Sequence, residues 1–120
     1  MLNRKDKEVV TYSGGMHNLL SGGTVLTGNL VTEDDIRIDG VIEGNIISRG
    51  KVIVGPNGTV SGDIECVNLD IMGKVTGNTQ CSEVVVLRST ANLNGDIKTR
   101  IIEIEPGAQF FGSCGMNNNG

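Results

Sequence analysis

The residue types that perform most protein chemistry are sparse in this sequence and do not form familiar sets. The only histidine, His17, lies before the repeats described below, so no serine or cysteine within the repeats has a histidine base beside it. The acidic run of Glu33, Asp34 and Asp35 offers the oxygen ligands that calcium prefers, but a solvated loop has the same composition and is what we expect. The sequence therefore predicts no catalytic residue, no cofactor and no metal site.

The composition favours a small all-β protein. The chain has 120 residues, enough for one domain, and its formal net charge of -4 argues against a nucleic-acid-binding surface. It contains 18 glycines and no tryptophan, and its apolar residues are mainly valine, isoleucine and leucine, a mixture that favours strands and tight turns. No apolar run is long enough for a transmembrane helix, and the N-terminus MLNRKDKE lacks the apolar stretch of a secretory signal. We therefore expect a cytoplasmic protein.

A five-residue motif with a central glycine occurs six times along the chain. Its copies are LTGNL from residue 26, IEGNI from 42, VSGDI from 60, VTGNT from 75, LNGDI from 93 and a divergent FFGSC from 110. Successive glycines are 15 to 18 residues apart. This period is too short for helical repeats and suits one turn of a β-solenoid.

Other positions keep the same register relative to these glycines. Residues two before, two after and four after each glycine alternate with polar positions, as does an apolar pair between successive glycines. The core columns predicted in this way include Ile42, Val60, Val75, Ile46, Ile64, Ile97, Cys66 and Cys81. Three short inward-facing strands in each turn predict a parallel β-helix of triangular cross-section, with about six coils stacked ~4.8 Å apart.

The glycine of the motif is expected to mark a corner between strands, where the backbone visits positive φ. The residue after it is always small and polar: Asn29, Asn45, Asp63, Asn78, Asp96 and Ser113. No two aspartates are neighbours in this column, and asparagine side chains there can hydrogen-bond along the stack. Length differences between coils fall in GPNG, RSTAN and EPGAQ, which predicts that one corner carries the longer loops.

The three cysteines are odd in number and lack the C-x-x-C spacing of many zinc sites, so neither a disulfide framework nor a zinc site is predicted. Cys66 and Cys81 occupy one inward column on consecutive coils, which places their Cα atoms about 5 Å apart, within disulfide range. The neighbouring members of this column, Thr32, Ser48 and Thr99, are all small. We therefore expect a narrow strip in which both thiols are buried as minor hydrophobic groups.

A stack of coils leaves an unpaired strand edge and apolar side chains at each end, which soluble solenoids usually cover with polar caps. Neither end of this sequence looks capped. The residues predicted to form polymerisation interfaces are Phe110, Phe111 and Leu93 at one end and Leu26 and Leu30 at the other. We expect each end to stack on another subunit and give a filament; the alternative is that the tails fold over the ends.

The sequence resembles the bactofilins, bacterial polymer-forming cytoskeletal proteins, from about Gly22 to Gly112. The resemblance rests on GTVLTGNL, IRIDGVIEGNI, KVIVGPNGTVSGDI and NGDIKTRIIEIEPGAQFFG, in this order. It implies a right-handed β-helix that assembles without nucleotide into non-polar filaments through hydrophobic terminal coils. It also implies a scaffolding role in cell shape, polarity or stalk-like appendages, with cell-wall enzymes or chromosome-segregation proteins as clients.

Many bactofilins carry a short N-terminal membrane-targeting peptide that is apolar and then basic. Met1, Leu2, Arg4 and Lys5 match this pattern faintly. One leucine adds little membrane affinity, so contact with the inner face of the cell membrane would depend on filament avidity. A plain disordered tail is the alternative.

The organisation predicted from these patterns is a flexible N-terminal tail at residues 1–20, a β-helical polymerisation domain at 21–114 and a short C-terminal tail at 115–120. The main hypothesis is a structural cytoskeletal protein whose chief partner is itself, with no enzymatic activity and no nucleic-acid partner. One alternative is a soluble β-helical binding module. Another is a hexapeptide-type acyltransferase that depends on His17.

Overall fold

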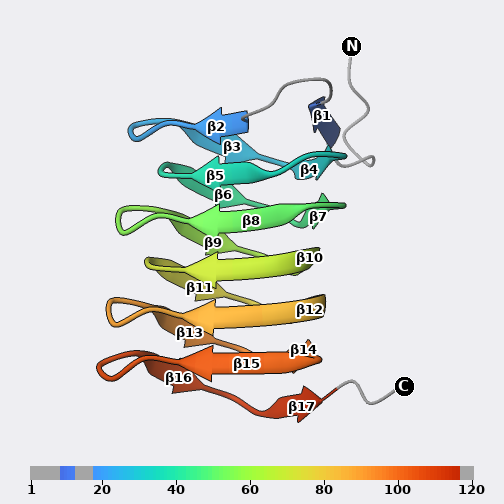
Figure 1. Ribbon diagram of the computed structural model, residues 1–120. Helices are drawn as coiled ribbons and strands as arrows, with labels where there is room; N and C mark the ends of the chain where they lie inside the picture. Colours follow the sequence, from blue (N-terminus) through green and yellow to red (C-terminus); the bar gives the residue numbers. More distant parts are fainter. Residues whose placement is uncertain (1–8, 13–17, 117–120) are drawn as a thin grey trace.

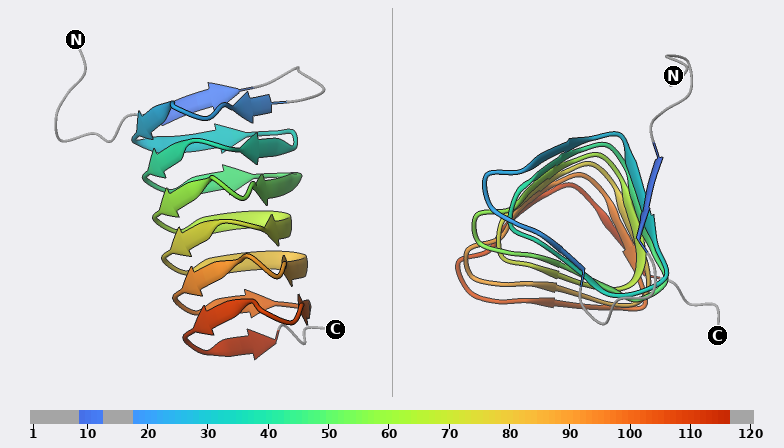
Figure 2. Two further views of the ribbon diagram at one scale, coloured as in Figure 1. Left: turned by 90° about the vertical axis from the view of Figure 1, so that its left-hand side faces the viewer. Right: turned by 90° about the horizontal axis from the view of Figure 1, so that it is seen from above.

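The computed structural model describes residues 9–12 and 18–116, and these residues form only strands, turns and bends. The chain descends in Figure 1 as a stack of coils, and the view along the axis in Figure 2 is triangular. Seen from the N-terminal end in Figure 2, the chain runs clockwise as it recedes, so the β-helix is right-handed. The predicted fold, a parallel β-helix of about six coils, is confirmed.

The three faces of the triangle are named here by their strands, all of which pair in parallel. Face 1 contains β1 (Val9–Tyr12), β4 (Asn29–Thr32), β7 (Ile46–Ser48), β14 (Ile97–Thr99), β17 (Cys114–Met116) and the first parts of β10 (Ile64–Ile71) and β12 (Thr79–Leu87). Face 2 contains β2 (Asn18–Leu20), β5 (Ile36–Ile38), β8 (Lys51–Val54), β15 (Ile101–Ile104) and the second parts of β10 and β12. Face 3 contains β3 (Val25–Thr27), β6 (Val41–Glu43), β9 (Thr59–Ser61), β11 (Lys74–Thr76), β13 (Asn92–Asn94) and β16 (Gln109–Phe111).

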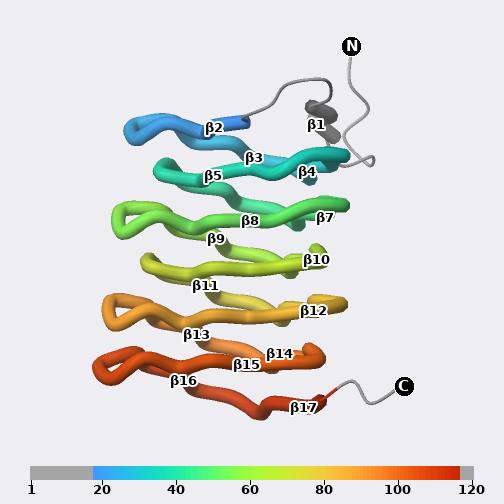
Figure 3. Tube along the Cα trace, viewed as in Figure 1, coloured from blue at the N-terminus to red at the C-terminus, as the bar shows by residue number. Residues whose placement is uncertain are grey.

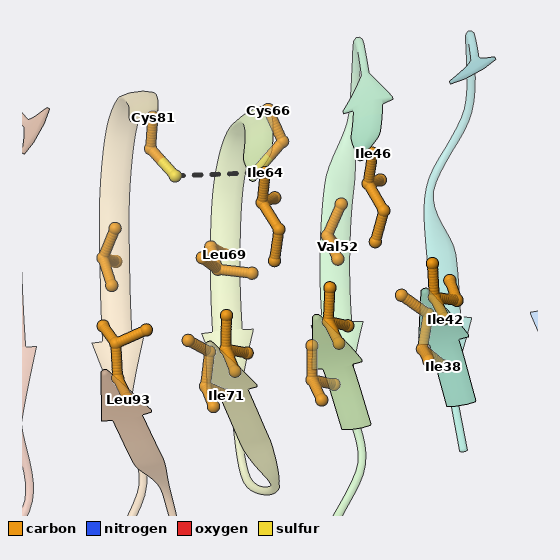
Figure 4. Packing of buried hydrophobic residues seen from close by; sticks show 14 of the residues in the cluster. Ile38, Ile42, Ile46, Val52, Ile64, Cys66, Leu69, Ile71, Cys81 and Leu93 are labelled. Carbon is orange, nitrogen blue, oxygen red and sulfur yellow. Dashed lines mark hydrogen bonds between the residues drawn. The ribbon is translucent and has the colours of Figure 1, made fainter. Parts of the chain in front are cut away.

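Consecutive coils are in register at the positions that the repeat aligns. On face 3, Val60 pairs with Ile42 on one side and with Val75 on the other. The inward residues are buried at 6% exposure or less: Ile42, Val60, Val75, Ile46, Ile64, Ile97, Cys66 and Cys81 among them. Figure 4 shows several of these side chains stacked in layers along the axis. The core is therefore a column of aliphatic layers, with each coil covering the one before it.

The regular coils extend beyond the limits expected for the β-helical domain. β2 begins at Asn18, three residues before the expected start at 21, and pairs in register with β5. β17 ends at Met116, two residues beyond the expected end at 114, and pairs with β14. β1 also pairs with β4, so part of the segment expected to be a tail at residues 1–20 belongs to the sheet.

The repeated glycines form the corner between face 3 and face 1, where their φ angles lie between 130° and 159°. Positive φ was expected there from the sequence. The structure adds a second reason for glycine, because corners of successive coils lie directly on one another. A Cβ atom on Gly77 would overlap the carbonyl oxygen of Gly62, and one on Gly62 would overlap that of Gly44.

The polar residues after these glycines form a continuous ladder. The backbone N–H of Asn45 donates to Oδ1 of Asn29 at 3.0 Å, and the N–H of Asp63 donates to Oδ1 of Asn45 at 2.9 Å. The same contact recurs in each later coil and ends with the N–H of Ser113, which donates to Asp96. The acceptor is a side-chain oxygen and the donor is backbone, so aspartate serves in this column as well as asparagine.

The longer loops project from a single corner, between face 2 and face 3, as the tube in Figure 3 shows. Each predicted insertion closes with a backbone turn, such as the bond from Gly58 N–H to Gly55 O at 2.9 Å and that from Ala91 N–H to Arg88 O at 2.9 Å. Insertions at this corner change neither the length nor the register of the strands.

Replacement of Gly77 by alanine should weaken the fold, because the new Cβ has no room against Gly62 and φ at this position is 144°. We expect the free energy of unfolding to fall by more than about 2 kcal/mol. Gly22→Ala is the matched control, since its Cβ would meet nothing nearer than the Asp39 carbonyl oxygen at 3.7 Å. Urea unfolding below the polymerisation concentration measures both, and equal losses would contradict the account of the corner.

Candidate functional site

The C-terminal end of the stack exposes the last layer of the core. β15, β16 and β17 pair on one side with β12, β13 and β14, and no described strand pairs with their other side. Phe110 is only partly buried, and Cys114 is exposed. Ile104 and Met116, which also face inward, are 51% and 48% exposed. This end therefore presents an apolar layer bordered by three open strand edges.

The residues predicted for this interface occupy three different positions. Phe110 lies in the end layer and pairs with Leu93 beneath it, so Leu93 is fully buried and supports the layer instead of facing outward. Phe111 is 59% exposed and follows Phe110 on the strand, which turns its side chain away from the core. Phe111 thus extends the outward column of face 3, whose earlier members are polar: Thr27, Glu43, Ser61, Thr76 and Asn94.

The N-terminal end is open on two faces and covered on the third. No described strand pairs with the outer edges of β2 and β3, where Leu19 and Val25 are 58% and 61% exposed and Leu26 is partly buried. On face 1, β1 pairs with the outer edge of β4, as Figures 1 and 2 show. Leu30, predicted to be an interface residue, lies under this strand and has no exposed surface.

Asn18 is a polar residue at an inward position of the first coil, in the column that continues with Ile36. Its Nδ2 donates to Thr32 Oγ1 at 3.1 Å and to the Asp35 carbonyl oxygen at 3.2 Å. These bonds satisfy polar groups at the corner between face 1 and face 2. The N-terminal end therefore closes part of its core with polar contacts, whereas the C-terminal end closes its core with none of this kind in the described residues.

Ion pairs tie the last coil to the coils before it. Arg88 donates to Asp70 at 2.7 Å and to Glu105 at 3.0 Å, so it bridges three successive coils at the loop corner. The hydrogen bond that Arg88 donates to Asp70, followed by the one that it donates to Glu105, raises the pKa of the Arg88 guanidinium. Because the Arg88 side chain is partly exposed to solvent, these ion pairs add only modest stability to the contact between the coils.

Cys66 and Cys81 pair in register, and their Sγ atoms lie 3.5 Å apart without a disulfide bond, as the dashed line in Figure 4 shows. The hydrogen bond with Cys81, together with burial, raises the pKa of the Cys66 thiol. Small neighbours fill the rest of this strip: Ser48 Oγ donates to Asp34 O and Thr99 Oγ1 donates to Glu83 O. Of the three cysteines, only Cys114 at the C-terminal end is exposed.

The acidic run contacts the next coil. Asp35 Oδ1 accepts from the Lys51 N–H at 2.8 Å, and Glu33 lies 3.7 Å from Arg49. Within the described residues, no cluster of three or more histidine, cysteine, aspartate or glutamate side chains is placed to hold a metal ion. The described part of the chain also contains no helix long and apolar enough to span a membrane. His17, Met1, Leu2, Arg4 and Lys5 lie outside the described residues.

A shallow hollow of about 610 Å³ lies on the outer surface of face 1, beside the glycine corner. Its lining includes ladder residues such as Asp63 and Asn78 and the outward side chains of Glu65, Gln80 and Lys98. A soluble binding module, the alternative hypothesis, would use this hollow on the side of the stack. Filament assembly would instead use the apolar surfaces at the two ends of the stack.

The family model for bactofilins, described as polymer-forming cytoskeletal, matches residues 18–115. The chain belongs to the bactofilin family. It is 34% identical over 101 residues to the bactofilin BacO of Myxococcus xanthus, in a match that covers 84% of this chain and 80% of BacO. It is 30% identical over 110 residues to BacP of the same organism, covering 91% of this chain but only 46% of BacP.

A solved structure supports the same assignment. A crystal structure of a mutant bactofilin from Thermus thermophilus matches this bactofilin with a TM-score of 0.56 and 29% identity, covering 80% of this chain and 99% of that chain. The matched family region begins at β2 and ends within β17, so it includes both terminal coils. β1 precedes the matched family region. This bactofilin is therefore a polymer-forming cytoskeletal protein by family.

Sequence reasoning overlooked two features of the N-terminal end of this bactofilin. The first is Asn18, whose column position becomes visible only when β2 is aligned with β5. The second is β1, whose sequence VVTY has strong β-propensity but lies outside the glycine-centred repeat. That propensity was the available signal for β1, and no repeat pointed to its partner.

The exposure of Cys114 provides a chemical reporter of the C-terminal end. In dilute protein, we expect iodoacetamide to alkylate Cys114 at least about tenfold faster than Cys66 or Cys81, because burial and the raised pKa of Cys66 disfavour its thiolate. In assembled protein, Cys114 should become protected as well. Mass spectrometry of tryptic peptides measures all three rates. Equal labelling of Cys114 before and after assembly would show that the C-terminal end is not part of the contact between subunits.

Proposed function

We propose that this bactofilin assembles without nucleotide into non-polar filaments by end-to-end stacking, and that the filaments scaffold cell-shape or cell-wall machinery. The family description supports a polymer-forming cytoskeletal role. The observation that carries the filament proposal is the open C-terminal end, where the inward residues Ile104, Phe110 and Met116 are uncovered. No described residue covers this terminal layer, and another molecule stacked on this end would bury it.

Backbone groups support the same conclusion. The Gly95 N–H donates to Phe111 O and the Ile97 N–H donates to Ser113 O, each reaching the following coil. In the last coil, Gly112 and Cys114 hold these positions, and the described chain supplies no further coil to accept from them. Another subunit stacked on this end would supply acceptors, at about 0.5–1.5 kcal/mol for each net hydrogen bond formed.

In the non-polar arrangement, like ends meet and alternate subunits point in opposite directions. Apolar burial and strand-edge pairing are equilibrium contacts that need no hydrolysis step, which is why we propose assembly without nucleotide. The contact is a surface of this chain against the same surface of a second copy.

Stacking through the ends leaves the three outer faces free along the filament. We propose that clients such as cell-wall enzymes bind these faces, which repeat at every subunit and so offer many equivalent sites. We also propose that Met1, Leu2, Arg4 and Lys5 add a weak membrane contact that becomes effective only through filament avidity.

The direct test replaces Phe110 by arginine. Stacking would remove water from an arginine charge in the end layer, and burial of an unpaired charge costs free energy. We therefore expect filaments to disappear while the circular dichroism spectrum of the subunit is retained. Thr76→Arg is the matched control, because it adds the same charge to an exposed outward position in the middle of face 3 and should leave filaments intact. Negative-stain electron microscopy and sedimentation measure both, and undiminished filaments of Phe110→Arg would remove Phe110 from the junction.

A further inference from the structure

β1 occupies the position that a preceding coil would take on face 1. It pairs with β4 in parallel, with Val10 opposite Leu30, Thr11 opposite Val31 and Tyr12 opposite Thr32. β4 in turn pairs with β7 in the same register, starting with Leu30 opposite Ile46. β1 therefore pairs with β4 in the same way as β4 pairs with β7. The described residues before β2 contain no other strand of such a coil.

This substitute strand makes the two ends unequal. A second copy that stacks on the C-terminal end finds the outer edges of β15, β16 and β17 available. A second copy that stacks on the N-terminal end finds β2 and β3 available, but the edge of β4 is already paired with β1. Full contact at the N-terminal end therefore requires β1 to leave β4.

We propose that β1 is a built-in competitor for the N-terminal end, so that two copies first join through their C-terminal ends and growth beyond this pair requires release of β1. The inference rests on the proposed end-to-end assembly. β1 is tethered to β2 through residues 13–17, and so short a connection gives an effective concentration in roughly the millimolar range. In dilute protein, β1 therefore remains paired with β4. At high subunit concentration, in solution or on a surface, a second copy displaces β1 from β4.

A reversible covalent lock tests this competition in the full chain. Thr11→Cys combined with Val31→Cys places two thiols on register partners of adjacent strands, whose Cα spacing of ~4.8 Å lies within disulfide range. Oxidised glutathione converts the two thiols to a protein disulfide and is itself reduced to two glutathione molecules. The locked protein should stop at pairs, with filament mass reduced at least about tenfold, and dithiothreitol should restore filaments.

Thr11→Cys alone, treated with the same reagents, is the control for effects of oxidation on the native cysteines, and it should assemble in both states. Filaments of the locked protein equal to those of the reduced protein would overturn the inference. Failure of the disulfide to form, read by mass spectrometry, would also overturn it, because β1 would then not lie on β4. Wild-type protein that forms no filaments in any condition would instead overturn the proposed function.

The opposite change provides an independent readout. In the repeat, the Leu30 N–H donates to Asn45 O, and the same register directs the Val10 N–H toward the Asn29 carbonyl oxygen. Val10→Pro removes this donor and should free the edge of β4, so we expect filaments to appear at a several-fold lower protein concentration. An unchanged or higher threshold, measured by sedimentation, would count against β1 as a competitor.

Discussion

Backbone pairing between successive coils is the interaction on which the rest of this molecule depends. Each coil is too short to hold its own core and is covered only by the coils before and after it, as with Val60 between Ile42 and Val75. The same dependence makes the first and last coils incomplete. In the proposed end-to-end assembly, self-association therefore continues the contact that folds the chain.

The glycine corner allows successive coils to stack closely, and the hydrogen-bond ladder beside it keeps the coils in register. A side chain at Gly62 or Gly77 would strike the carbonyl of the coil before it, so the corner sets how closely coils approach. Each ladder oxygen then holds a backbone N–H of the next coil, as Asn45 holds Asp63. The loop corner between face 2 and face 3 carries none of these constraints and absorbs the variation in repeat length.

Much of this architecture was predictable because the period-two alternation and the glycine spacing are local patterns that repeat six times. The buried column that contains Ile46 and Ile64 follows directly from that register. Features that occur once were beyond its reach. β1 has no repeat that identifies β4 as its partner, so the sequence did not show that Leu30 lies under a paired strand. The outward direction of Phe111, by contrast, follows from the register that places Phe110 inward. The right-handed course came from the family resemblance and not from the repeat pattern, and the structure confirms it.

The C-terminal end thus has open strand edges on all three faces, whereas the N-terminal end is partly covered by β1. Both end surfaces are perpendicular to the axis of the stack. X-ray diffraction from aligned filaments tests most directly whether coils continue to stack along the filament. Strands perpendicular to the filament axis should give a meridional reflection at ~4.8 Å, as for stacked strands in general. A reflection at this spacing on the equator would show that subunits join side by side, and it would contradict end-to-end assembly.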